Sequence, residues 1–132
     1  MNEILSNFEK LILLSKEKEK FDKKHIWSEG SKTFIEELKK EIEEVIVEYN
    51  NEKQIYLEDE LGDVLWDYLN LLVNLEVENK IDFKRVFTRA NKKFSQRVSG
   101  INYNSNWNEI KKKQKEELKI EQEMFEKSKI KN

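Results

Sequence analysis

The stretch that decides the fold is Leu57 to Leu75, LEDELGDVLWDYLNLLVNL, whose apolar residues recur three and four positions apart. That spacing places one continuous apolar stripe along an α-helix. The stripe is rich enough in leucine to form the centre of a core, and it predicts a helix that starts around Gln54 and closes at Lys80. On this helix Glu60 and Asp63 lie one turn apart beside the stripe, so one segment carries both the core and a candidate functional pair.

The other segments show the same period, and nothing in the chain favours a sheet. Zero prolines and three glycines leave few breaks, and no stretch has the Val-, Ile- and Thr-rich alternation of strands. The sequence predicts an all-α fold, an antiparallel helical bundle of four to five helices. The expected helices are residues 4–14, fading into the charged run 16–24; a helix capped by Ser31 or Thr33 and ended by Asn50-Asn51; the central helix; one from Asp82 to near Gly100; and a charged helix at about 105–128.

Composition sets the size of the core. The 132 residues form one domain by length, with a core at about 1–100 and the charged C-terminal helix beyond it. Charged residues reach 39% and hydrophobic residues 37%, so the interior must come from helical stripes rather than continuous apolar runs. A partner subunit would help to bury those stripes.

Charge, cysteine content and hydropathy count against several classes of protein. The net charge of -2 does not favour nucleic-acid binding, and the absence of cysteine excludes disulfides and thiolate zinc sites. No apolar run approaches the length of about 18 residues that a membrane span needs. The N-terminal stretch is amphipathic and has no signal-peptide cleavage site, so we expect a cytoplasmic protein.

Two acidic pairs, Glu41/Glu44 and Glu60/Asp63, are the candidate functional residues. The same spacing also occurs in solvated, lysine-rich parts of the chain, so spacing alone favours a solvated face over a metal site. The two central pairs differ because each lies at the edge of its helix's apolar arc. If the helices pack together, four carboxylates converge, and a hard divalent cation is the usual partner of such a cluster.

Neighbouring residues extend both acidic rows. Glu37 and Glu48 continue the first row and Asp67 the second, and like charges four apart repel by about 0.2–0.5 kcal/mol per pair. An interior helical glycine such as Gly62 costs about 1 kcal/mol relative to alanine, which indicates close approach of a neighbouring backbone or a ligand. Carboxylates without His or Cys suit Mg²⁺ or Mn²⁺ better than zinc.

The helix after Asp82 supplies positive charge. Lys93 and Arg97 lie four residues apart and border its phenylalanine stripe. This row fits a solubilising face when taken alone. Beside a carboxylate-bound metal, a lysine and an arginine are also what a polyphosphate needs, because the cations neutralise the charge that the metal leaves.

Four elements in order resemble the MazG-type nucleoside triphosphate pyrophosphohydrolases, all-α enzymes that bind Mg²⁺. They are the Glu41/Glu44 pair, LEDELGDVL at 57–65, ANKKFSQR at 90–97 and WNEIK at 107–111. The resemblance implies that Glu41, Glu44, Glu60 and Asp63 are catalytic metal ligands and that Lys93 and Arg97, with Asn91, bind the phosphates of the substrate. It also implies a homodimer or a dimer of dimers.

The resemblance further implies Mg²⁺-dependent hydrolysis of NTPs or dNTPs to a nucleoside monophosphate and pyrophosphate, by attack of water at the α-phosphorus. Glu37 or Glu48 is a candidate for orienting that water. Two alternatives stay open, namely a narrow dUTP or dCTP pyrophosphatase and a non-enzymatic helical interaction module. Trp27 is a candidate for stacking on a nucleobase or for packing on the first helix. His25 is expected to be an incidental surface residue.

Overall fold

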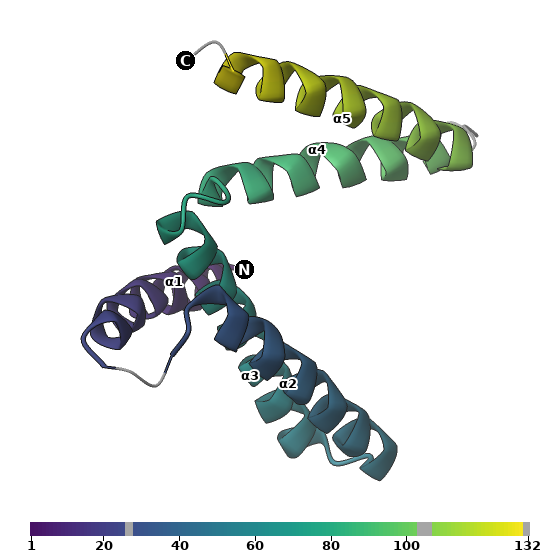
Figure 1. Cartoon of the computed structure of the whole chain (residues 1–132). Helices are drawn as coiled ribbons and strands as arrows, with labels where there is room; N and C mark the ends of the chain where they lie inside the picture. The colour runs from purple at the N-terminus through teal and green to yellow at the C-terminus, as the bar shows by residue number, and fades with distance from the viewer. Residues whose placement is uncertain (26–27, 103–106, 131–132) are drawn as a thin grey trace. The chain divides into compact units, whose positions relative to one another are not determined.

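Most of the described residues are helical. The computed structural model describes residues 1–25, 28–102 and 107–130, which contain five α-helices and no strand (Figure 1). This confirms the predicted all-α fold. The helices are α1 (Asn2–Lys23), α2 (Ser31–Asn51), α3 (Gln54–Val77), α4 (Phe83–Asn102) and α5 (Trp107–Ile130).

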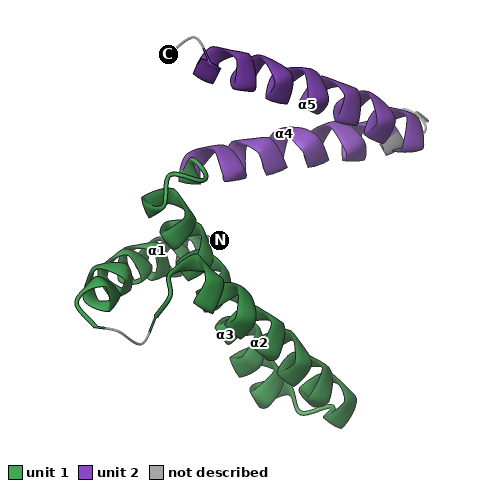
Figure 2. Ribbon diagram, viewed as in Figure 1, with its two compact units in different colours: residues 1–83 green, residues 84–132 purple. Residues whose placement is uncertain are grey.

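Contacts divide the chain into two compact units, Met1–Phe83 and Lys84–Asn132, which are coloured separately in Figure 2. The first unit contains α1, α2 and α3, and the second is built from α4 and α5.

The first unit is organised around α3, which packs against both α1 and α2. A connection of only Glu52 and Lys53 joins α2 to α3, so the two helices run antiparallel side by side (Figure 1). Glu52 makes the reversal in the left-handed conformation, at φ 54°. The central position expected for the 57–75 stretch is confirmed, because α3 supplies most of the buried apolar residues. The buried apolar side chains in the described chain are Phe34, Leu69, Leu72 and Val73.

Helix α1 is longer than the sequence indicated. The charged run that was expected to end the helix instead continues it to Lys23. Two salt bridges stabilise this part of the helix, one between Lys18 and Asp22 and one between Lys23 and Glu19. In each bridge the two partners lie four residues apart, about one helical turn. Glu19 and Asp22 are buried, so the run is part of the packed structure rather than a solvated tail.

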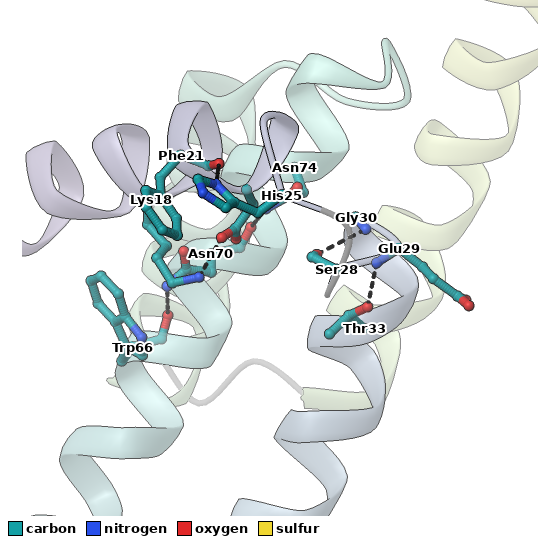
Figure 3. Close-up of polar contacts among 11 residues, drawn as sticks. Lys18, Phe21, His25, Ser28, Glu29, Gly30, Thr33, Trp66, Asn70 and Asn74 are labelled. Atoms are coloured by element: carbon teal, nitrogen blue, oxygen red, sulfur yellow. Dashed lines mark hydrogen bonds and ion pairs between the residues drawn. The ribbon is translucent and has the colours of Figure 1, made fainter.

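Helices α1 and α3, which pack together, both bury polar side chains. Asn70 of α3 is fully buried and donates its side-chain N–H to the carbonyl of Trp66, while buried Asn74 donates to the carbonyl of Asn70 (Figure 3). Ser15 of α1 is also fully buried and donates its hydroxyl to the carbonyl of Ile12. These side chains donate to the backbone of their own helices, whereas Oδ1 of Asn70 is buried and accepts no hydrogen bond from the described chain.

The start of α2 differs from the sequence prediction. The N-cap is Gly30 at φ 74°, and neither Ser31 nor Thr33 makes a capping hydrogen bond from its side chain. Thr33 Oγ1 instead accepts the N–H of Glu29, at 2.7 Å (Figure 3). The predicted end of the helix at Asn50-Asn51 is confirmed.

The second unit is a helical hairpin. Arg89 of α4 makes a bidentate contact with Glu121 of α5, with its two nitrogens 2.9 and 2.6 Å from the carboxylate oxygens. Helix α4 begins one residue after the predicted Asp82 and runs past Gly100, and α5 has no buried residue among those described. No described helix combines the length and apolar character that a bilayer span requires.

Candidate metal centre

The antiparallel pair of α2 and α3 brings the two acidic pairs together. One carboxylate oxygen each from Glu41, Glu60 and Asp63 lies within 4.8 Å of the others. Ligand oxygens on opposite sides of one divalent cation lie about 4–5 Å apart. The three carboxylates can therefore share a single ion.

Glu44, an exposed residue of α2, completes the cluster. Its carboxyl group lies within hydrogen-bonding reach of both Glu41 and Glu60. All four carboxylates predicted from the sequence thus lie in one place. Only Glu41, Glu60 and Asp63 have oxygens within 4.8 Å of one another. Their function as metal ligands stays a prediction.

The cluster has negative charge in excess of its local partners. Among the described residues, no Lys or Arg forms a salt bridge with any of the four carboxylates. Oε2 of Glu41 and Oε2 of Glu60 are buried and accept no hydrogen bond from the described chain. Buried carboxylate oxygens without donors are costly, and coordination of a cation would satisfy them. The donor set fits a hard divalent ion.

Mutual repulsion and burial raise the pKa values of these groups. Burial, followed by the contact with Glu44, raises the pKa of Glu41 from 4.5 to about 7. The hydrogen bond with Glu44 is the main reason for the raised pKa of Glu60, and burial is the main reason for that of Asp63. Near pH 7 the Glu41 carboxyl of the metal-free cluster is therefore partly protonated, and a bound cation would displace that proton.

Asp67 lies one turn further along α3 and is buried, with 8% of its surface exposed. Burial, together with repulsion from Glu37 and Asp63, raises its pKa to about 6. The sequence placed Asp67 in the acidic row, but the row alone gave no sign of its burial. It extends the acidic seam beyond the four proposed ligands.

The family of this chain is shown by its sequence. Residues 29–101 match the sequence model of the MazG nucleotide pyrophosphohydrolase domain, which is more than half of the chain. The chain belongs to the MazG family. No curated protein and no solved structure matched it. Membership supports nucleotide pyrophosphohydrolase activity in general, and with it the hydrolase class.

The matched MazG region contains α2, α3 and nearly all of α4, and it leaves out α1 and α5. All four carboxylates of the cluster lie within it, as do Asn91, Lys93 and Arg97. The acidic cluster is therefore part of the MazG domain itself.

The three phosphate-binding candidates lie on α4, in the second compact unit of the MazG protein. Asn91 Oδ1 accepts the hydroxyl of Ser95, at 3.1 Å, and the Lys93 ammonium lies 5.6 Å from the ring centre of Phe94. Arg97 is only 7% exposed. These contacts give each residue a local partner, and phosphate binding stays a prediction for all three.

Arg97 has a packing role that the sequence did not reveal. Its Nε donates to Oε1 of Gln114 at 2.8 Å, and its guanidinium lies 5.3 Å from the ring centres of both Phe94 and Trp107. Gln114 also donates to the carbonyl of Lys93. Arg97 therefore holds α4 against α5, and it helps to line a groove of about 720 Å³ between them.

Gly62, His25 and Trp27 are the remaining residues to which the sequence assigned a possible role. A Cβ on Gly62 would meet no atom within 4 Å, so the close backbone approach proposed for this glycine was wrong for the described chain. His25 stacks on Phe21 with ring centres 4.1 Å apart, and its Nδ1 lies 2.9 Å from the Phe21 carbonyl at the end of α1 (Figure 3). Trp27 lies outside the described residues.

Proposed function

We propose that this MazG protein hydrolyses nucleoside triphosphates, NTPs or dNTPs, to a nucleoside monophosphate and pyrophosphate with Mg²⁺, or Mn²⁺, as the cofactor. The observation that carries the proposal is the approach of Glu41, Glu60 and Asp63 to within 4.8 Å, inside the region that matches the family. Glu44 is the fourth proposed ligand.

The reaction adds water across the bond between the α- and β-phosphates. The water oxygen ends on the α-phosphorus, the bond to the bridging oxygen breaks, and pyrophosphate leaves. A bound Mg²⁺ would neutralise phosphate charge and lower the pKa of a coordinated water. Glu41, Glu44, Glu60 and Asp63 would hold the ion, and Asn91, Lys93 and Arg97 are the proposed phosphate contacts.

Glu48 is the better candidate for orienting the attacking water. Its Oε2 is buried and accepts no hydrogen bond within the described chain. Glu37, the other candidate, lies 3.5 Å from the ammonium of Lys40. An unengaged carboxylate oxygen on the row that carries Glu41 and Glu44 is better placed to accept a proton from water.

A homodimer is part of the proposal. Helix α2 leaves large apolar side chains exposed, with Ile46 at 54% and Tyr49 at 71%, and Leu61 of α3 is 49% exposed. Burial of such side chains against a second copy would stabilise the assembly by about 25 cal/mol per Å² of apolar surface.

The test is incubation of the protein with each NTP and dNTP plus Mg²⁺, followed by identification of the products. We expect pyrophosphate and monophosphate, with the breadth of substrates distinguishing a general enzyme from a dUTP- or dCTP-specific one. Orthophosphate with a diphosphate would contradict the reaction. Loss of turnover in Glu41→Gln and Asp63→Asn, but not in the control Glu43→Gln on the exposed side of α2, would support the ligand assignment.

A further inference from the structure

The end of α3 holds the start of α2 through one carboxylate. Glu78, the C-cap residue of α3, accepts the backbone N–H of Ser31 at 2.8 Å and the Ser31 hydroxyl at 2.6 Å. The first N–H groups of a helix have no partner within the helix, and a negative charge there is favourable. Glu78 thus does the work of a capping side chain from 47 positions away in the chain.

Both sides of this contact are fixed by the backbone. The Glu78 N–H donates to the carbonyl of Asn74, and the Lys80 N–H donates to the carbonyl of Leu75, each at 2.9 Å. On the other side Gly30 has φ 74°, a backbone conformation that residues with a side chain rarely adopt, and a Cβ there would lie 2.6 Å from Oε2 of Glu78. A side chain at this position would therefore strain the backbone and displace the Glu78 carboxylate. We call the contact of Ser31 with Glu78 the clasp.

The clasp lies at the opposite end of the α2 and α3 pair from their short connection. Glu52 and Lys53 join the helices at one end, and the clasp joins them at the other. Glu41 lies ten residues from Ser31, which is about 15 Å along a helix. The carboxylate cluster is thus held between two fixed points.

We propose that Glu78 is a positioning residue that, through Ser31, sets the alignment of α2 on α3 and so places Glu41 and Glu44 opposite Glu60 and Asp63. This inference rests on the proposed metal centre. A connection at one end alone permits the far ends of two helices to separate. Metal ligands tolerate errors of only a few tenths of an ångström, so a small separation would weaken the site.

The chain offers a matched control two residues away. Glu76 Oε2 accepts the N–H of Phe83, the first residue of α4, at 2.7 Å. This is the same chemistry, a carboxylate from the end of α3 on the first N–H of another helix. Glu76, however, does not hold α2.

The experiment measures Mn²⁺ dissociation constants by electron paramagnetic resonance for the wild-type protein, Glu78→Ala, Glu78→Gln, Gly30→Ala and Glu76→Ala. The measurements are made at a temperature at which circular dichroism shows each variant folded. We expect Glu78→Ala and Gly30→Ala to weaken binding about 10-fold, the lower end of the loss when groups that orient metal ligands are removed. Glu76→Ala should stay within about twofold of wild type, because its cap does not touch α2.

Glu78→Gln keeps an acceptor oxygen for Ser31 and should recover most of the affinity. Equal losses in Glu78→Ala and Glu76→Ala, or in Glu78→Ala and Glu78→Gln, would overturn the positioning role. If Glu78→Ala does not fold, Ser31→Ala removes only the hydroxyl contact and decides the matter by the same comparison with Glu76→Ala. Unchanged binding in the clasp variants would refute the clasp alone, whereas a wild-type protein that binds no Mn²⁺ would remove the metal centre as well.

Discussion

Replacing Glu41 by glutamine should stabilise the metal-free protein. Burial and the neighbouring carboxylates raise the pKa of Glu41 from 4.5 to about 7, so ionisation of this group opposes folding. The folded state then holds a proton that the unfolded state releases between these two values. Stability of the wild-type protein therefore falls as pH rises from 4.5 towards 7 and levels off above it. Glutamine has the same shape and no charge to lose.

The size of the stabilisation by Glu41→Gln follows from the shift in the pKa of Glu41. A shift from 4.5 to about 7 would correspond to about 3 kcal/mol if fully expressed. Because the carboxyl group remains in contact with solvent, which screens the repulsion, we expect about 1–2 kcal/mol at pH 8. For a chain of this length that raises the melting temperature by about 3–8 °C. At pH 4.5 or below the gain should vanish.

The assay is thermal unfolding followed by circular dichroism in the presence of a chelator, at pH 4.5 and pH 8. Glu43→Gln, which removes the same charge from an exposed position of α2, is the control and should change little. With Mg²⁺ added, the wild-type protein should gain more stability than Glu41→Gln, because the variant has lost a ligand. A Glu41→Gln variant that is less stable than wild type at pH 8 without metal would refute the electrostatic reasoning, as would a gain of equal size at both pH values.

Two further predictions concern metal affinity and the core. Mg²⁺ affinity, measured by calorimetry, should fall about tenfold between pH 8 and pH 6, because Glu41 with its pKa of about 7 must lose its proton to bind; a flat profile would exclude Glu41 as a ligand. Leu69→Ala should lower the free energy of unfolding, measured by chemical denaturation, by about 2–5 kcal/mol, because Leu69 is fully buried. Ile46→Ala, at a 54% exposed position, should lower that of the isolated chain by under about 1 kcal/mol. Equal losses would contradict the assignment of the core.

The regular parts of the fold could be predicted because they depend on local patterns. The apolar period of the 57–75 stretch gave α3, and Asn50-Asn51 marked the end of α2 correctly. The extension of α1 was missed because charged residues such as Glu19 and Asp22 are buried and paired, which a count of apolar residues does not detect. The cap of α2 was missed because it comes from Glu78, a residue distant in sequence.

The acidic cluster could be predicted because both acidic pairs lie at the edge of the apolar face of their helices. Two such edges meet where neighbouring helices pack together. The burial of Asp67 and Arg97 could not be predicted from the sequence, because it depends on which helices pack against these residues. Arg97 shows the limit most clearly. Its spacing from Lys93 suggested a phosphate contact, while its hydrogen bond to Gln114 shows a packing contact that no spacing rule contains.

The two-residue link between α2 and α3 has a consequence for how the protein folds. The proposed ligands on the two helices are only about 20 residues apart in sequence, and contacts this local generally form early, in microseconds to milliseconds. We therefore expect the cluster of like charges to form together with the α2 and α3 hairpin, before more distant contacts such as that of Ser31 with Glu78. Divalent ions present during refolding should accelerate this step by relieving the repulsion.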